Sequence, residues 1–236
     1  MNSNIFSGYL FASTASELRP RDVFMSPRIA YVGSIDGTQW VRFVYRTAAA
    51  LLGELADAHG ATLGVNAPFE YSVFVRIGTH GHVLFLAQKR IIIDTMIAQE
   101  RAERLRLPIG ERAVPLHRVR VAVHRLVTSL STSVSPFALT RVDANVPVGD
   151  AMKFLVLYGD DIGQSGTFAK IAPSLRFHAC GVKRKTAAVE QFHIDSQGRV
   201  RCPRPDRDTA GAVDKILSYL YAHDYLRTDK ELWTSK

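Results

Sequence analysis

Apolar and polar residues alternate with a period of two in several stretches of the chain, which is the pattern of a strand with one buried face. Glycine-containing segments interrupt two of these stretches, at Asp36-Gly37 and between Gly78 and Gly81, and each predicts a hairpin. A further turn is predicted at residues 196–198. The predicted strands and hairpins are 6–11, 29–46, 71–87, 116–125, 136–144, 174–182, 188–194 and 199–203.

Apolar residues recur with the helical period of 3.6 in three other stretches, 47–59, 89–107 and 209–226. The last of these follows Asp206 and Asp208, and aspartate is a preferred residue at the N-cap of a helix. Strands and helices are mixed without a regular βαβ rhythm. The predicted fold class is therefore α+β, with mixed, largely antiparallel sheets and packed helices.

The residue pattern does not predict the secondary structure of two stretches. Residues 128–135, TSLSTSVS, are polar and of low complexity, so they indicate either a hinge or a solvated loop. Residues 146–161, VPVGDAMKFLVLYGDD, are compatible with a strand or a short buried helix, because periodicity does not separate the two. The length of 236 residues fits one large or two small domains. We expect an N-terminal α+β part at 1–125 and a C-terminal α+β part at 126–236, which contains a basic hairpin and the final helix.

Charge is distributed unevenly along the chain. The net charge is +8, and 22 of the 30 basic residues are arginine. Residues 101–125 and 176–207 each sum to +5, so the other 179 residues sum to −2. Arginine binds phosphate and carboxylate groups bidentately, although a GC-rich genome also enriches this residue. Two separate basic segments on an otherwise slightly acidic chain favour a polyanionic partner.

The candidate nucleic-acid contacts come from these two segments. Arg199 and Arg201 share one face of a predicted strand, and Arg118 and Arg120 share one face of another. Basic residues also stabilise helix ends, form i,i+4 pairs such as Glu100 with Arg104, and protect edge strands. The full candidate set is Arg101, Arg104, Arg118, Arg120, Lys183, Arg184, Lys185, Arg199, Arg201, Arg204 and Arg207. Helix-turn-helix, zinc-finger and RRM signatures are absent, so we expect contacts mainly to the nucleic-acid backbone with weak sequence selectivity.

Signals for catalysis are weak. His80 and His82 have the spacing of a same-side pair, but a zinc site needs further ligands nearby. Asp160 and Asp161 offer two carboxylates for Mg²⁺, which keeps a metal-dependent nuclease as an alternative. Ser165 lacks the Gly-x-Ser-x-Gly context of a nucleophile elbow. Walker A and dinucleotide-binding motifs are also absent, so we expect no nucleotide cofactor and no catalysis.

Cysteine content and the N-terminus indicate the compartment. Cys180 and Cys202 are the two cysteines, without disulfide or zinc spacing, and their proximity to His178 and His193 is explained by strand alternation. The first residues lack a basic segment followed by an apolar run, and no stretch of eighteen apolar residues occurs. These features predict a cytoplasmic protein without membrane insertion.

Several stretches resemble the RexA-like phage-exclusion family of bacteriophage lambda. They are NIFSGYLFAST, EYSVFVRIGTHGHVLFL, LTRVDANVPVGDAMKFLVLYGDD and the ending SLRFHACGVKRKTAAVEQFHIDSQGRVRCPRPDRDTAGAVDKILSYLYAHDYL. The resemblance implies a fold akin to RdgC-like DNA-binding proteins, a homodimer, and nonspecific binding of double-stranded DNA in prophage-encoded exclusion of other phages.

The leading hypothesis is a non-catalytic double-stranded DNA-binding protein of phage defence, dimeric and assisted by an effector partner. One alternative is the nuclease that uses Asp160 and Asp161. The other is an interaction subunit whose basic face binds an acidic protein.

Overall fold

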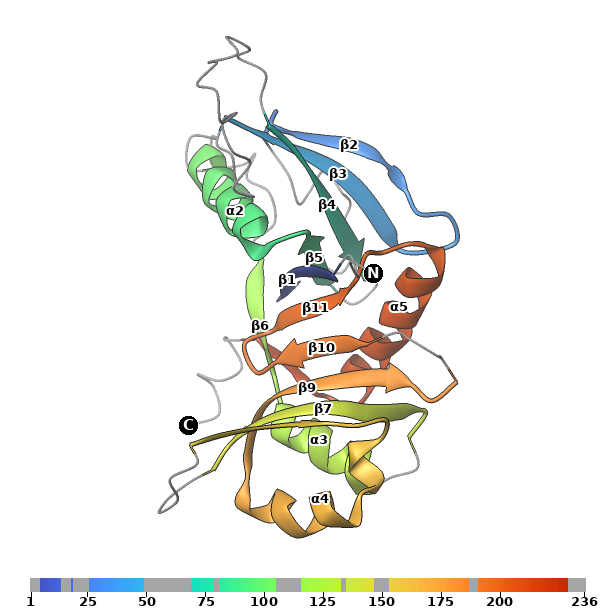
Figure 1. The fold of residues 1–236 in the computed structure, drawn as a ribbon. Helices are drawn as coiled ribbons and strands as arrows, with labels where there is room; N and C mark the ends of the chain where they lie inside the picture. The colour runs from blue at the N-terminus through green and yellow to red at the C-terminus, as the bar shows by residue number, and fades with distance from the viewer. Residues whose placement is uncertain are drawn as a thin grey trace, which may run out of the picture.

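A computed structural model describes residues 5–13, 18, 26–48, 69–78, 81–104, 116–132, 135–146, 153–186 and 191–228. It shows an α+β fold built on one large antiparallel sheet, to which all twelve described strands are connected (Figure 1). The predicted fold class is confirmed at this level.

Strand β1, Ile5–Ala12, lies in the middle of the sheet between β5 and β11. From β1 towards one edge the strands are β5 (His82–Ala87), β4 (Phe69–Ile77), β3 (Trp40–Thr47) and β2 (Ile29–Ser34). Towards the other edge they are β11 (Arg199–Pro203), β10 (Phe192–Asp195), β9 (Arg176–Arg184), β7 (Phe137–Asn145) and β8 (Phe154–Tyr158). Strand β6 (His117–Val121) pairs with the end of β1 and with β12 (Leu226–Thr228).

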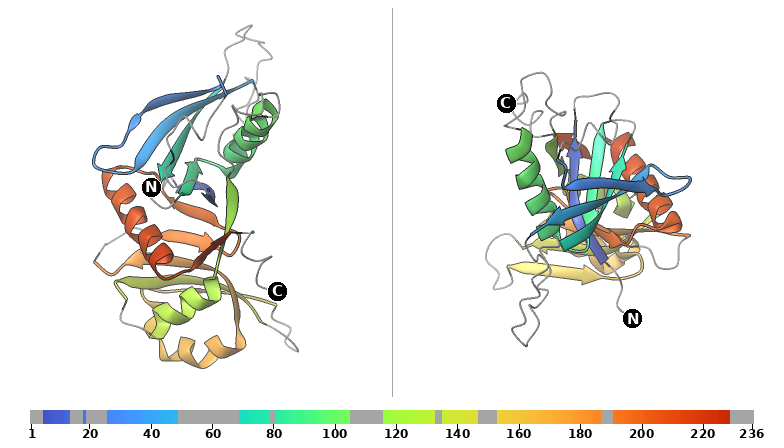
Figure 2. Two further views of the ribbon diagram at one scale, coloured as in Figure 1. Left: turned by 180° about the vertical axis from the view of Figure 1, so that it is seen from behind. Right: turned by 90° about the horizontal axis from the view of Figure 1, so that it is seen from above.

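Two hydrophobic cores lie on opposite faces of this sheet, because successive side chains of a strand point to opposite faces. Leu10 of β1 belongs to the larger core, together with the apolar faces of α3 (Val123–Thr132) and α5 (Arg207–Ala222). Its neighbours Tyr9 and Phe11 belong to the second core, which α2 (Arg90–Arg104) covers. Figure 2 shows α3 and α5 together on the side of the sheet that faces away from the viewer in Figure 1.

The α2 side of the sheet is only partly covered. Its core contains residues of β1, β3, β4, β5 and α2, and among the described residues none from β7 to β11. The remaining helical segments lie next to the α3 core: η1 (Ile162–Gln164), α4 (Gly166–Ile171) and η2 (Ala172–Ser174). Strands β11, β10, β9 and β7 therefore face the viewer of Figure 1 without a described helix over them.

The predicted hairpins at 29–46 and 71–87 and the predicted strands 6–11, 136–144, 174–182, 188–194 and 199–203 are confirmed in type, except that residues 79–80 and 188–190 lie outside the described residues. The ambiguous stretch 146–161 contains strand β8, and residues 147–152 lie outside the described residues. The predicted helix 89–107 is confirmed as α2 over residues 90–104, and residues 105–107 lie outside the described residues. The predicted helix 47–59 lies outside the described residues except for Thr47, which ends β3, and Ala48.

The prediction of a strand over 116–125 is wrong beyond residue 121, and residues 128–132 are helix rather than hinge or loop. Both errors have one cause, helix α3. Its buried residues Val123, Leu126, Val127 and Leu130 follow the helical period, and Arg125 and Leu126 break the alternation that Val119, Val121 and Val123 begin. The hydroxyls of its polar residues donate hydrogen bonds to carbonyl oxygens four residues earlier, which satisfies them within the helix: Thr128 to His124, Ser131 to Val127 and Thr132 to Thr128.

The C-terminal helix is also shorter than predicted. Asp206 caps its N-terminus, since its carboxylate accepts the N–H of Thr209 at 2.9 Å, and Asp208 lies inside the helix. The helix ends at Ala222 instead of residue 226, because a turn at Asp224, with φ of 54°, redirects the chain into β12. The domain division predicted after residue 125 falls inside α3, and it stays a prediction.

Candidate nucleic-acid interface

The part of the sheet over which the structure describes no helix carries a row of polar side chains. Arg201 of β11 lies opposite His193 of β10, and His193 lies opposite Gly181 of β9. Gly181 in turn lies opposite Arg141 of β7, whose neighbour on β8 is Tyr158. Directly opposed residues of an antiparallel pair point to the same face. We define the basic face as the surface formed by Arg118, Arg141, His193, Arg199, Arg201 and Tyr158.

Strand β1 brings the two basic segments of the sequence together on this face. Its residues 5–9 pair with β11 and place Tyr9 opposite Arg199, whereas residues 11–12 pair with β6 and place Phe11 opposite Arg118. The guanidinium carbon of Arg118 lies 4.1 Å from the centre of the Tyr9 ring, a cation–π contact. Arg118 and Arg199 therefore flank one aromatic ring, although 80 residues separate them.

Acidic residues accompany three of the four arginines. Arg118 lies 3.7 Å from Asp94, Arg199 lies 3.7 Å from Asp195, and both arginines are exposed. Exposed pairs at such distances are weak, so a phosphate group can compete with these carboxylates. Arg201 is exposed and has no ion pair within the part of the chain that the structure describes.

A buried charge cluster supports the centre of the face. Asp143 is 6% exposed and accepts two hydrogen bonds from Arg141, at 2.6 and 2.8 Å. This bidentate contact raises the pKa of Arg141, and its guanidinium also lies 5.0 Å from the Tyr158 ring. Nε2 of His193 lies 3.7 Å from Asp143, too far for a hydrogen bond.

Burial determines the protonation of His193. Desolvation lowers its pKa, the charge of Asp143 opposes this effect, and the positive charges of Arg141 and Arg201 add to it. His193 is consequently neutral near pH 7. The positive charge of the basic face comes from arginine alone at that pH.

The structure separates the predicted contact residues into two groups. Arg118, Arg199 and Arg201 belong to the basic face, and Arg120 lies beside it, where its Nη1 donates to Gln197 Oε1 at 2.5 Å. Arg101 is exposed on α2. The side chains of Arg104 and Arg207 lie outside the description.

The other four predicted contacts are either paired with aspartate or directed away from the basic face, although Lys183, two residues from Gly181 on β9, lies on that face. Lys183 and Lys185 pair with Asp160 and Asp161 at 3.2 and 3.3 Å. Arg184 lies opposite Phe137, a residue of the larger core, so it points to the opposite face of the sheet. Arg204 also lies on that opposite side, with its guanidinium carbon 5.8 Å from the ring of Phe74.

The same ion pairs occupy the carboxylates of the nuclease alternative. Asp160 is bound to Lys183, and Asp161 to Lys185 and to the N–H of Leu139 at 3.3 Å. Within the described ranges, no group of three or more His, Cys, Asp or Glu residues has the geometry to hold a metal ion. This arrangement adds no support to a metal-dependent reaction at Asp160 and Asp161.

Other candidate groups have structural roles. The hydroxyl of Ser165 caps α4 by accepting the N–H of Phe168. Cys180 and Cys202 are buried free thiols, and burial raises the pKa of Cys180 to about 12, which suppresses its nucleophilicity. His178 packs against Phe154, with 5.3 Å between ring centres. His80 lies outside the described residues, and His82 packs edge-on against Tyr221.

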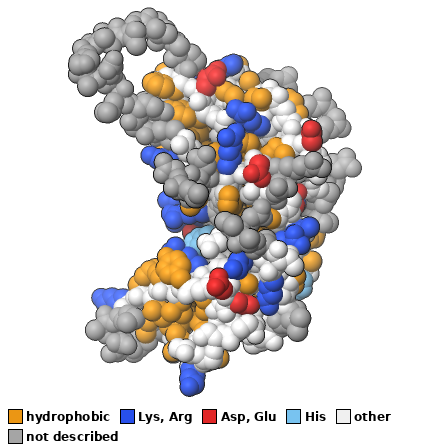
Figure 3. Space-filling model, turned by 45° about the vertical axis from the view of Figure 1, so that its right-hand side comes forward, with side chains coloured by type: hydrophobic (Ala, Val, Ile, Leu, Met, Phe, Trp, Pro, Cys, Tyr) orange, Lys and Arg blue, Asp and Glu red, His pale blue; other side chains and the backbone are white. Residues whose placement is uncertain are grey.

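Arg141, Asp143 and Tyr158 were missed as site residues. A signal was present, since Arg141 and Asp143 are the two charged residues of a predominantly apolar strand and lie two positions apart, so they mark one polar face. Figure 3 shows Lys, Arg and His side chains gathered where the molecular surface is hollowed, at the left margin of that view. None of the helices that the structure describes is long and apolar enough to cross a membrane.

Comparison with protein-family models and with curated proteins finds no match to this chain.

Proposed function

We propose that this chain is a non-catalytic protein that binds double-stranded DNA without sequence selectivity, through the phosphate backbone. The observation that carries the proposal is the convergence of two basic segments, distant in sequence, on one uncovered face of the sheet. Arg199 and Arg201 lie two residues apart on β11, about 6.6 Å along the strand, and this spacing lets them contact neighbouring phosphates.

The geometry of the face favours phosphate over an acidic protein partner. Its arginines lie on a sheet surface that also carries small residues, such as Ser7 opposite Arg201 and Gly181 opposite His193, which leaves room for the phosphate backbone of a duplex to approach. Guanidinium groups donate bidentately to phosphate oxygens, and contacts of this kind are independent of base sequence. We identify no element that enters a groove to read bases within the described part of the chain.

The biological setting follows from the resemblance to RexA-like proteins. We propose that the chain acts as a homodimer in the cytoplasm, in phage exclusion, with an effector partner that executes the response. A dimer places two basic faces on one duplex and strengthens binding through multivalency. Light scattering at micromolar concentration, with and without DNA, tests the dimer.

The DNA-binding experiment compares two pairs of charge reversals. Arg199→Glu with Arg201→Glu removes two adjacent contacts of the basic face, whereas Arg101→Glu with Arg104→Glu changes the same net charge on α2. We expect the first variant to lose duplex affinity by at least tenfold and the second to lose much less, because each charged hydrogen bond contributes about 1.5–3 kcal/mol. Gel shifts and fluorescence anisotropy on folded protein measure the effect.

A single-residue control sharpens the comparison. Arg204→Glu changes a residue only three positions from Arg201, but on the opposite side of the sheet. Equal losses for Arg201→Glu and Arg204→Glu would show that net charge, and not the basic face, determines binding. Incubation of supercoiled and linear DNA with Mg²⁺ or Mn²⁺ tests catalysis, and cleavage that Asp160→Ala abolishes would contradict the non-catalytic proposal.

A further inference from the structure

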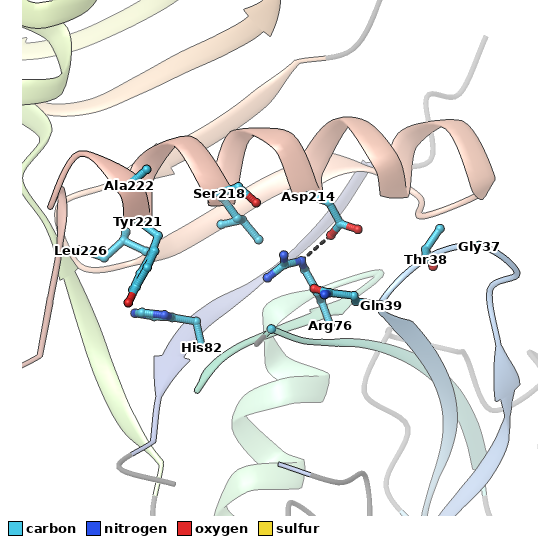
Figure 4. Close-up of a pocket in the computed structure, with 12 residues that line it drawn as sticks. Gly37, Thr38, Gln39, Arg76, His82, Asp214, Ser218, Tyr221, Ala222 and Leu226 are labelled. Atoms are coloured by element: carbon cyan, nitrogen blue, oxygen red, sulfur yellow. Dashed lines mark hydrogen bonds and ion pairs between the residues drawn. The ribbon is translucent and has the colours of Figure 1, made fainter. Parts of the chain in front are cut away.

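A pocket of about 730 Å³ lies on the side of the sheet opposite the basic face, between α5, the β2–β3 turn and the adjoining ends of β4 and β5 (Figure 4). Its size is that of sites for small organic ligands. At its centre is Arg76 of β4, whose side chain is 8% exposed. Burial of a guanidinium is costly unless its charge and its N–H groups are compensated.

The hydrogen bonds described for Arg76 use only its Nε. Its Nε donates to Oδ1 of Asp214 on α5, and the same oxygen accepts the indole N–H of Trp40 at 3.1 Å. Among the described residues this is the only hydrogen bond of the guanidinium, so its two terminal nitrogens have no described protein acceptor. In Figure 4 these nitrogens point away from Asp214 into the pocket, towards the side where Tyr221 and His82 lie.

The backbone leaves space for this guanidinium. A Cβ atom at position 78 would lie 2.7 Å from Nη1 of Arg76, so any side chain at Gly78 would displace the arginine. The guanidinium of Arg76 is buried, lies against Gly78 and points into a cavity, and a charged group in this position can contact a ligand. A salt bridge that served stability alone would also have its remaining N–H groups paired within the protein.

The rest of the pocket lining indicates the kind of ligand. Gln39 and Ser218 provide polar side chains near Arg76. Tyr221 and His82 form an edge-to-face pair 5.4 Å apart, and Leu217 and Leu226 add apolar surface. The pocket therefore offers a bidentate oxyanion donor at one point and an aromatic and apolar surface a short distance away.

We propose that this pocket binds a small aromatic oxyanion, whose phosphate or carboxylate group accepts hydrogen bonds from the terminal nitrogens of Arg76 and whose ring packs against Tyr221 and His82. The site lies across the sheet from the basic face and does not depend on DNA binding.

Isothermal titration with a panel of probes tests this assignment. The probes are inorganic phosphate, acetate, benzoate, and the monophosphates of adenosine and uridine. We expect saturable binding of aromatic oxyanions and much weaker binding of phosphate and acetate, because these lack the ring. A preference for benzoate or for the nucleoside monophosphates distinguishes a carboxylate ligand from a phosphate ligand. Absence of saturable binding to the folded protein up to millimolar concentrations, or equal binding of inorganic phosphate, would overturn the proposal.

Two variants separate ligand binding from structural support. Asp214→Asn retains an acceptor for Arg76 and Trp40 but removes the competing negative charge, so it should tighten anion binding by about tenfold. Arg76→Met with Asp214→Asn removes both charges without leaving one buried alone, and should weaken binding by roughly tenfold to a hundredfold. Unchanged affinity in this double variant, or weaker binding in Asp214→Asn, would contradict the assigned role of Arg76.

The matched control is Arg46→Met with Glu70→Gln. This pair joins β3 and β4 near the end of their pairing that is remote from Arg76, and its side chains are 45% and 53% exposed. Ligand affinity should be unchanged. Tyr221→Ala, at a residue that is 43% exposed, removes the aromatic surface with little effect on the core and should weaken only the aromatic probes.

Discussion

At the level of single residues, Asp143 organises the centre of the basic face. It is buried, and the bidentate contact from Arg141 balances its charge, which leaves His193 close to both groups but without a hydrogen bond at Nε2. Loss of Arg141 alone would leave a buried carboxylate without compensation, which is more destabilising than loss of both partners. Protonation of His193 would add a positive charge beside Asp143 and Arg141 and so change the balance of charge in this cluster.

The pKa of His193 predicts how stability depends on pH. Burial lowers this pKa in the folded protein, so the unfolded chain takes up the proton first as pH falls through the ordinary histidine value of about 6.5. The folded state therefore loses stability below this pH. We expect His193→Gln to reduce the loss between pH 7.5 and 5.5, as measured by urea denaturation.

The exposed His117 is the control for this prediction, because it lies on β6 away from the buried cluster. His117→Gln should retain the wild-type dependence on pH. A His193→Gln variant that loses as much stability as wild type over this interval would show that another group controls the response.

At the level of elements, β1 holds the two parts of the sheet together. It pairs with β5 on one side and with β11 and β6 on the other, so both basic segments and both cores depend on its position. Gly8 allows the close approach of β1 and β5, because a Cβ atom there would lie only 1.6 Å from the carbonyl oxygen of Phe85. A side chain at this position must push the strands apart.

Two glycine substitutions test this role. Gly8→Ala should lower the free energy of unfolding by about 3 kcal/mol, because overpacking must distort the strand pairing. Gly211→Ala, in α5, should raise it by about 0.5–1 kcal/mol, since its Cβ would meet nothing within 4 Å and alanine favours the helix. Urea denaturation measures both values, and a neutral Gly8→Ala would show that β1 and β5 separate without cost.

At the level of the whole molecule, the two faces of the sheet have different properties. One carries the arginines of the basic face, and the other carries the larger core and the Arg76 pocket. A single sheet therefore separates the proposed DNA contact from the proposed small-molecule site. Ligand binding and DNA binding can be measured independently on the same protein.

Salt dependence tests the DNA contact at this scale. If roughly four to eight phosphates are neutralised, the plot of log affinity against log salt concentration should have a slope on the order of −4 to −7. Arg201→Glu should reduce the magnitude of that slope by about one, because one phosphate contact is lost. Anisotropy titrations across salt concentration provide the measurement, and a wild-type slope near zero is incompatible with phosphate binding.

The local parts of this structure were predictable from the sequence because their causes lie within a few residues. Alternation identified the strands, Asp36-Gly37 and Gly78–Gly81 marked the hairpin turns, and Asp206 marked the start of α5. Alternation also placed Arg199 and Arg201 on one face of their strand, and Arg118 and Arg120 on one face of theirs. These results require only the geometry of a strand or a helix turn.

The remaining features of the fold and of the site depend on which strands and side chains, distant in sequence, become neighbours. Sequence pattern did not reveal that β1 pairs with both β11 and β6 along one side, so it could not show that Arg118 joins Arg199 while Arg184 and Arg204 point to the other face. Nor could it pair Arg76 with Asp214, 138 positions away. Residues of one strand share a face by local geometry, but which strands become neighbours is determined by the burial of both cores at once, and this is a property of the whole folded chain.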